Sequence, residues 1–189
     1  MNTNDGAGTK KYTLVVLVED KPGVLNRVSS LFRRRAFNIE SIAVGHTESV
    51  GRSRMTIVVS GSEAMVEQVR KQLSKVIEVV KVTDITGEST IHRELALIRV
   101  KATVSNRSEI MQLIDVFRAT IVDVAADSFM VEVTGDEAKI ESLCNLLRGY
   151  GIEELARTGA IAMTRGASGP IQSQEVEKKR VLKAKDRKK

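Results

Sequence analysis

Apolar and polar positions alternate along the chain in a pattern that occurs twice. Short runs rich in β-branched residues are separated by stretches in which apolar residues recur every three or four positions, as in strands and amphipathic helices. In the first half, the predicted elements are a strand at 11–19, a helix at 21–35, strands at 38–47 and 54–60, a helix after Ser62 and a strand at 77–85. In the second half, they are a strand at 94–103, a helix after Asn106, strands at 121–125 and 129–133, a helix after Asp136 and a last strand at 152–164.

This order predicts an α+β protein with two ferredoxin-like βαββαβ domains in tandem, each with helices on one face of an antiparallel sheet. A polar break at 86–90 separates the halves, and their spacing is that of small domains. We therefore expect a flexible N-terminus at 1–10, a first domain at 11–86, a linker at 87–92, a second domain at 93–166 and a basic, disordered tail at 167–189.

Polar residues mark the predicted starts of three helices. Ser62 and Asp136 are of the types that accept hydrogen bonds from first-turn amides, and Asn106 followed by Glu109 resembles a capping box. Within the last helix, Cys144 lies on the apolar stripe, which predicts a buried thiol rather than a nucleophile.

The composition argues against several classes of protein. Hydrophobic residues make up 42% of the chain but aromatic residues only 3%, which predicts an aliphatic core. The longest apolar runs are too short to cross a bilayer and the polar N-terminus lacks a signal-peptide pattern, so we expect a cytoplasmic protein with no membrane contact. A single cysteine excludes an internal disulfide. His46 and His92 have no neighbouring ligand residues, which disfavours a metal site and predicts surface positions. No glycine-rich phosphate loop follows a strand, so nucleotide chemistry is disfavoured too.

Most of the net charge of +6 comes from one end of the chain. Residues 175–189 contain eight Lys or Arg and three acidic residues, a charge of +5. Such a segment is typical of a solvated, disordered tail, and we favour that interpretation over an arm that binds nucleic acid. A βαββαβ sheet that binds RNA also needs exposed aromatic residues on its central strands, where the first sheet has only Tyr12.

The turn between the first strand and the first helix has the features of an amino-acid site. Asp20 ends the apolar run as a candidate N-cap, and Pro22 and Gly23 start the helix. Because Gly23 has no side chain, the first-turn amides stay accessible, and the helix dipole favours an anion such as a carboxylate. Asn38, one helix length later, offers a donor and an acceptor. These residues alone leave a ligand site and a simple cap followed by a turn equally open.

Several segments carry a resemblance to a known family. In the first half they are Val18–Val28, Leu31-Phe32, Phe37–Ile42 and Ser53–Ile57. In the second half they are Arg93–Ile98, Phe117–Ala119, Val122–Val124, Thr158-Gly159 and Thr164–Gly166. The first set resembles the ACT domain of the acetolactate synthase small subunit, and the second set continues that match. The resemblance covers about residues 11–166.

The resemblance implies a regulatory, non-catalytic subunit. In that family a large catalytic subunit uses thiamine diphosphate, FAD and Mg²⁺, and the small subunit raises its activity and confers feedback inhibition, typically by valine. The family therefore implies no cofactor in this chain, a homodimer through the ACT domains and a branched-chain amino-acid effector that is valine, leucine or isoleucine. Carried over by position, the effector-binding residues are Asp20, Gly23, Val24, Leu25, Asn38 and Ile39.

Local physical chemistry suggests a role for each residue in that set. Amides near Gly23–Leu25 would hold the effector carboxylate, and Asp20 with Asn38 would hold its ammonium group. Val24, Leu25 and Ile39 would line the side chain. The main alternative is a free-standing ACT-type sensor that regulates another enzyme or a transcription system, and a third is a nucleic-acid binder that uses the basic tail.

Overall fold

The structure is a computed structural model and describes residues 10–34 and 37–166. The expectations for residues 1–9 and for the basic tail at 167–189 therefore lie outside the described residues. The chain divides into two compact units. The first holds the residues up to Glu40, Val44–Thr90 and those from Thr164 onward; the second holds Ser41–Ala43 and Ile91–Met163.

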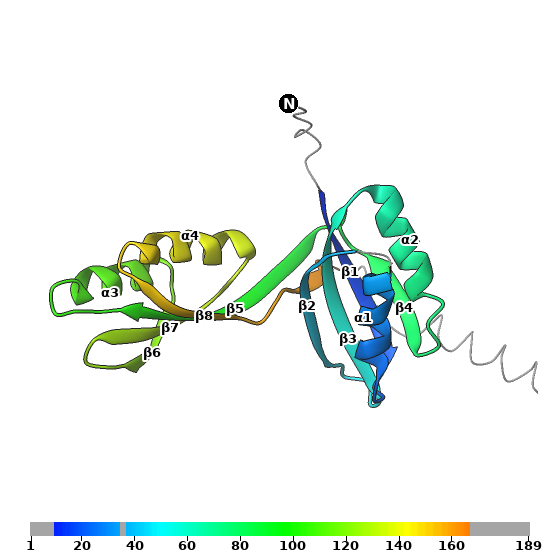
Figure 1. The fold of residues 1–189 in the computed structure, drawn as a ribbon, viewed down its shortest axis with the longest axis horizontal. Coiled ribbons are helices and arrows are strands. Elements are labelled where there is room, and N and C mark those ends of the chain that lie inside the picture. Colours follow the sequence, from blue (N-terminus) through cyan, green and yellow to red (C-terminus); the bar gives the residue numbers. More distant parts are fainter. Residues whose placement is uncertain (1–9, 35–36, 167–189) are drawn as a thin grey trace, which may run out of the picture. The chain divides into compact units, whose positions relative to one another are not determined.

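The first unit is a four-stranded antiparallel sheet with two helices on one face (Figure 1). The strand order is β2-β3-β1-β4, so β2 and β4 are the edges. Its elements are β1 (Lys10–Glu19), α1 (Val24–Arg34), β2 (Ile39–His46), β3 (Arg52–Gly61), α2 (Glu63–Leu73) and β4 (Val79–Asp84).

An aliphatic core lies between this sheet and its helices. The pairing of β1 with β3 sets Leu14 opposite Ile57 and Val16 opposite Met55, and all four side chains are buried. The helices complete the core with one apolar stripe each, as the helical period predicts. The buried residues on the two stripes are Val24, Val28, Leu31 and Phe32 on α1 and Val66, Val69 and Leu73 on α2.

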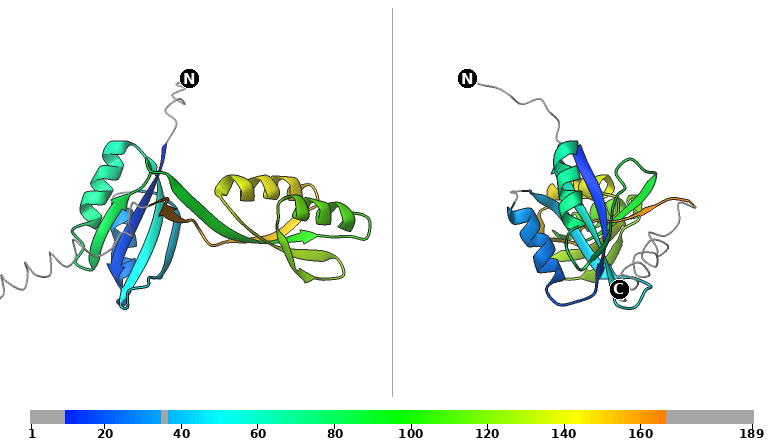
Figure 2. Two further views of the ribbon diagram at one scale, coloured as in Figure 1. Left: turned by 180° about the vertical axis from the view of Figure 1, so that it is seen from behind. Right: turned by 90° about the vertical axis from the view of Figure 1, so that its right-hand side faces the viewer.

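The second unit repeats the architecture with an additional short strand. Its sheet has the order β6-β7-β5-β8, with β9 paired to β5, and α3 and α4 lie on one face (Figures 1 and 2). Its elements are β5 (Thr90–Lys101), α3 (Arg107–Val116), β6 (Thr120–Val124), β7 (Ser128–Gly135), α4 (Glu137–Arg148), β8 (Ile152–Arg157) and β9 (Ile161–Thr164). The predicted α+β class with two ferredoxin-like βαββαβ units is confirmed.

Register also explains the core of the second unit. Ile98 pairs with Val131 and Val100 with Phe129, which places these side chains on the face that α3 and α4 cover. Cys144 is buried in the same core, as predicted from its place on the apolar stripe of α4.

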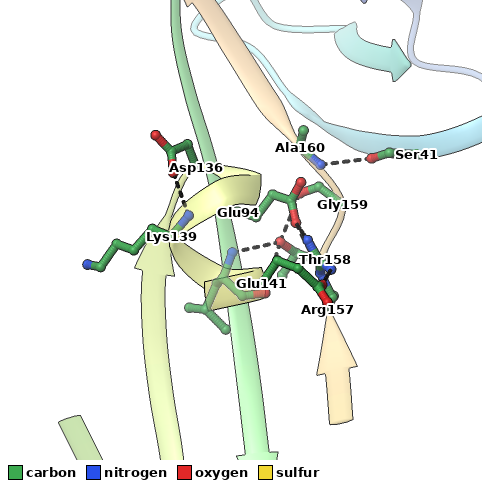
Figure 3. A network of polar contacts seen from close by, with 10 residues as sticks. Ser41, Glu94, Asp136, Lys139, Glu141, Arg157, Thr158, Gly159 and Ala160 are labelled. Atoms are coloured by element: carbon green, nitrogen blue, oxygen red, sulfur yellow. Dashed lines mark hydrogen bonds and ion pairs between the residues drawn. The ribbon is translucent and has the colours of Figure 1, made fainter. Parts of the chain in front are cut away.

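One part of the sequence prediction for this unit is wrong. The single strand expected at 152–164 is broken into β8 and β9, because Gly159 adopts a left-handed φ of +81°. After this break, the Ala160 amide donates a 2.9 Å hydrogen bond to Ser41 Oγ (Figure 3). Ser41 lies in β2 but is one of the three β2 residues that are grouped with the second unit. In addition, β5 begins at Thr90, inside the segment expected to be a linker.

The helix caps follow the prediction at two of three helices. Ser62 Oγ accepts from the Met65 amide and Asp136 Oδ1 accepts from the Lys139 amide, so both are N-caps. The prediction of a capping box at Asn106 is wrong. Asn106 precedes α3 but makes no side-chain cap, because its backbone is helical rather than extended, and the Glu109 carboxylate accepts instead from the Tyr150 hydroxyl at 3.2 Å.

An ion pair within the second unit joins the strands β5 and β8. Both Nε and Nη2 of Arg157 donate to one oxygen of Glu94, at 3.1 and 2.6 Å, and Arg157 also lies 3.7 Å from Glu141 (Figure 3). The Glu94 side chain is only 10% exposed. The pair therefore has less water to compete with it than an ordinary surface pair has.

We expect Glu94→Ala to lower the free energy of unfolding of the full chain by about 1–2 kcal/mol, because the change leaves the partly buried Arg157 without its main acceptor. Urea denaturation followed by circular dichroism measures this loss. The matched control is Glu154→Ala, which removes a pair with Arg99 that is mostly exposed and is expected to change the free energy by less than about 0.5 kcal/mol. Equal losses in the two variants would contradict the prediction.

Candidate functional site

The turn that joins β1 to α1 carries the candidate site. Helix α1 begins at Val24, three residues later than the sequence pattern predicts, so Gly23 immediately precedes it. Asp20 is therefore not an N-cap, and the prediction of that role is wrong. Instead, the Asp20 amide donates to the Gly51 carbonyl at 3.0 Å, which ties the turn to the hairpin between β2 and β3.

Backbone donors are available at the start of α1. Gly23 has a left-handed φ of +84°, and a Cβ placed there would meet nothing within 4 Å. In the described part of the chain, the amides of Gly23 and Leu25 donate to no protein acceptor, while the Val24 amide donates to the Lys21 carbonyl at 3.4 Å. Free amides at the positive end of a helix dipole suit a carboxylate.

The Asp20 carboxylate is held by residues from two strands. Ser53 Oγ on β3 donates to Asp20 Oδ1 at 3.2 Å, and His46 Nδ1 at the end of β2 lies 3.3 Å from Asp20 Oδ2. The Asp20 side chain remains 45% exposed. Since a carboxylate can accept about four hydrogen bonds, it keeps the capacity to accept from a ligand.

Neither His46 nor Ser53 belongs to the site predicted from the sequence. The β1–β3 register places Ser53 opposite Val18, near the end of β1 and close to Asp20. His46 is the last residue of β2, and β2 ends beside the same part of β1. Both contacts depend on strand pairing, so the local pattern of the sequence contains no signal for them. The prediction that His46 is a surface residue is confirmed, as its side chain is 83% exposed.

The apolar residues of the predicted site differ in accessibility. Val24 is 4% exposed, so its side chain belongs to the core. Leu25 is 47% exposed, and Ile39 is half-buried at the start of β2. Leu25 and Ile39 are therefore the two side chains that can contact an apolar part of a ligand.

Asn38 and Ile39 lie at the opposite end of the sheet from Asp20. The Thr47 amide donates to the Arg52 carbonyl at 3.1 Å, and Arg52 pairs with Glu19, so the end of β2 lies beside the Asp20 turn. The eight residues of β2 place its start roughly 23 Å away, at about 3.3 Å per residue. Within one chain, the structure therefore does not bring Asn38 and Ile39 to Asp20, Gly23 and Leu25. In its own surroundings, Asn38 Nδ2 donates to Glu40 at 3.2 Å.

Ion pairs surround the Asp20 turn. Arg27, one turn into α1, pairs with Glu78 in the segment before β4. Glu19 lies 2.7 Å from Lys21 and 3.6 Å from Arg52. The Glu19 amide also donates to the Glu78 carbonyl at 2.8 Å. These contacts link the end of β1, next to the turn, to β3 and to the segment before β4.

Other features of the described residues do not offer a reactive thiol, a metal site or a membrane span. Burial raises the pKa of the Cys144 thiol, and the charge of Glu141 adds to the rise, which keeps the thiol protonated and unreactive. Among residues 10–34 and 37–166, no group of three His, Cys, Asp or Glu side chains is arranged to hold a metal ion. No helix in the described part of the chain combines the length and apolar character that a membrane span requires.

Two family models match the chain, one for each unit. The model described as "AHAS small subunit-like ACT domain" matches residues 14–81, and the model described as "Small subunit of acetolactate synthase" matches residues 93–166. Together they cover most of the residues that the structure describes.

Relatives match along nearly their whole length. A probable acetolactate synthase small subunit of Archaeoglobus fulgidus is 61% identical over 156 residues, which are 82% of this chain and 98% of the relative. The acetolactate synthase small subunit of Bacillus subtilis is 54% identical over 157 residues, covering 82% of this chain and 91% of the relative. The crystal structure of the Thermotoga maritima acetolactate synthase small subunit has a TM-score of 0.78 at 43% identity and covers 83% of this chain and 98% of that one.

Proposed function

Because this chain belongs to the family of acetolactate synthase small subunits, we propose that it activates a catalytic large subunit and makes that enzyme sensitive to a branched-chain amino acid, with valine as the first candidate. The relatives are small subunits of the holoenzyme, so the role of this chain in it is regulatory and not catalytic. In this proposal thiamine diphosphate, FAD and Mg²⁺ belong to the catalytic partner.

The observation that carries the proposal is that free amides and a carboxylate lie in the same turn, before and at the start of α1. The amides of Gly23 and Leu25 offer hydrogen bonds to an anion, and Asp20 offers an acceptor to a cation. An α-amino acid carries both charges on one carbon, so a single molecule can satisfy both groups. The exposed Leu25 side chain favours an aliphatic amino acid over a polar one.

The separation of the two predicted halves supports a site shared by two copies of the chain. In the sheet of the first unit β2 is an edge strand, and edge strands can pair with a strand of another chain; Val44 on β2 is 48% exposed. If two copies pair their β2 edges antiparallel, the start of each β2 meets the end of the other. Asn38 and Ile39 of one copy then lie next to the Asp20 turn of the second copy. A two-fold dimer would therefore contain two equivalent effector sites.

Inhibition then follows from linkage. An effector shifts the holoenzyme toward a less active state only if it binds that state more tightly, and the coupling is reciprocal. A site made from two copies can differ in effector affinity between the two states, because a rearrangement of the dimer changes the distance between the two parts of the site. Valine binding and activation of the catalytic subunit are expected to oppose each other.

The free-standing sensor is the alternative function. Such a sensor would need only the ACT domain of the first unit. It does not account for the second unit, in which residues 93–166 match the small-subunit model. The proposed function accounts for both units.

We expect Asn38→Ala to weaken binding of the effector by about tenfold, because the change removes a hydrogen bond to a charged group. Calorimetric titration of the full chain with valine, leucine and isoleucine measures the affinity. Asn145→Ala on α4 makes the same change in the other unit and is expected to bind as the wild type does. Equal affinities in all three proteins would remove Asn38 from the site.

The activating role needs its own experiment. The full chain is mixed with the large subunit from the same organism, and acetolactate formation is measured with and without valine, leucine or isoleucine. We expect the chain to raise the rate and one of the three amino acids to lower it again. Failure to stimulate the large subunit would contradict the proposed function.

A further inference from the structure

Ser53 on β3 is a polar residue in an otherwise apolar series. Alternate positions on the core-facing side of this strand carry Met55, Ile57 and Val59, and their side chains are at most 2% exposed. Ser53 continues this series and is itself 6% exposed. A hydroxyl at such a position costs free energy unless it forms a hydrogen bond, because it is removed from water. Packing alone therefore favours an apolar residue at this position, and the hydroxyl needs a different explanation.

The Ser53 hydroxyl donates to the Asp20 carboxylate. Ser53 Oγ lies 3.2 Å from Asp20 Oδ1, and a carboxylate accepts without donating. The Asp20 amide donates to the Gly51 carbonyl at 3.0 Å, so the backbone and the side chain of Asp20 are both tied to residues 51–53. Ser53 has a fixed place, because it pairs with Val18 in the ladder between β1 and β3. One oxygen of the carboxylate is therefore held against a central strand of the sheet.

The second carboxylate oxygen of Asp20 stays accessible. The Asp20 side chain is 45% exposed, and the His46 side chain, whose Nδ1 lies 3.3 Å from Oδ2, is itself mostly exposed. Oδ2 therefore keeps the capacity to accept a hydrogen bond from a ligand. An ammonium group that binds a side chain already held in one rotamer avoids the entropy cost of ordering that side chain.

We propose that Ser53 is a positioning residue of the effector site, whose hydroxyl holds the Asp20 carboxylate in the orientation that receives the ammonium group of the effector. This inference rests on the proposed function and extends it by naming a buried residue that acts through Asp20. Loss of the hydroxyl leaves the charge of Asp20 in place but lets its side chain adopt other rotamers. The affinity for the amino acid then falls, while the affinity for the same molecule without its ammonium group does not.

Calorimetric titration of the full chain with valine, leucine and isoleucine tests the inference. Ser53→Ala removes the hydroxyl and is expected to lower the affinity about fivefold, the typical effect of one hydrogen bond. Ser53→Thr keeps a hydroxyl and is expected to bind within about twofold of the wild type. The matched control is Ser60→Ala, which makes the same change near the other end of β3 and should bind as the wild type does.

A second ligand distinguishes positioning of Asp20 from a general loosening of the turn. The deamino analogue of the amino acid that binds, which is isovalerate for valine, keeps the carboxylate and the aliphatic chain but has no ammonium group. Ser53→Ala is expected to bind this analogue as the wild type does, so its preference for the amino acid over the analogue falls about fivefold. Equal losses for the two ligands would overturn the inference, because Ser53 would then only stabilise the turn.

The outcomes separate this inference from the proposed function. If the wild type binds none of the three amino acids, the proposed function fails and the role of Ser53 fails with it. If the wild type binds and Ser53→Ala binds equally well, only the role of Ser53 is overturned. Binding by Ser53→Thr that is as weak as binding by Ser53→Ala would also overturn that role, because the hydroxyl would then not be the cause.

Discussion

Replacing Gly23 with aspartate is expected to reduce effector affinity by about 10- to 100-fold and to produce a holoenzyme that stays active at effector concentrations that inhibit the wild type. The substitution places a carboxylate beside the free amides of Gly23 and Leu25, where the effector carboxylate is expected to bind. Two like charges about 4 Å apart repel each other by roughly 1–4 kcal/mol near a protein surface. The effect on inhibition is read from rates of acetolactate formation across a range of valine concentrations.

The control for this prediction is Gly23→Asn, which has nearly the same shape but no charge. Gly23 has a φ of +84°, and Asn and Asp are the non-glycine residues that tolerate such a backbone best. A Cβ at Gly23 meets nothing within 4 Å, and the strain of a side chain at this φ is shared by both variants, so it cancels in their comparison. Gly23→Asn should therefore bind the effector much more tightly than Gly23→Asp. If the two variants bind equally, charge repulsion is not the cause, and the carboxylate does not bind at these amides.

The elements of the fold could be predicted because their signals are local. The apolar stripes of α1, α2 and α4 are spaced at the helical period, and Ser62 and Asp136 mark two helix starts as caps. Most strands were predicted within a few residues from their β-branched runs. For these parts the local preference of the chain and the tertiary packing agree.

The sequence predictions failed at residues where the local backbone conformation, and not the residue type, determines the structure. Asn106 has a cap residue type but a φ of −114° and a ψ of −3°, so its side chain cannot reach the first-turn amides. The break at Gly159 depends on a left-handed φ that a glycine permits but does not require. Asp20 was expected to cap α1, but the helix starts later, at Val24, and Asp20 contacts strands instead. Residue type alone does not distinguish these cases.

The candidate site was predictable only in part, for a topological reason. Asp20, Gly23 and Leu25 are adjacent in sequence, so elementary helix physics could group them. Asn38 was grouped with them through its chemistry and the family resemblance, and only the strand order shows that it lies at the other end of β2. The contacts of His46 and Ser53 with Asp20 join three separate elements and could not be seen without the structure.

A mixed dimer is expected to recover one effector site when each chain carries a defect in a different half. One chain carries Gly23→Asp and the other Asn38→Ala. If the Asp20 turn of one chain works with Asn38 of the other, one of the two sites then contains both defects and the second contains none. The mixed dimer should bind one effector with wild-type affinity, although each variant alone binds weakly. Two different affinity tags allow the mixed dimer to be purified from both parent dimers.

The most direct test of the shared site compares that mixed dimer with a second one, in which both substitutions are on one chain and the other chain is wild type. Calorimetric titration with the effector counts the high-affinity sites in each. A site shared between chains predicts one high-affinity site in the first mixed dimer and none in the second, because every shared site of the second contains one defective half. The reverse result, none in the first and one in the second, would show that each chain forms its own site and would contradict the account.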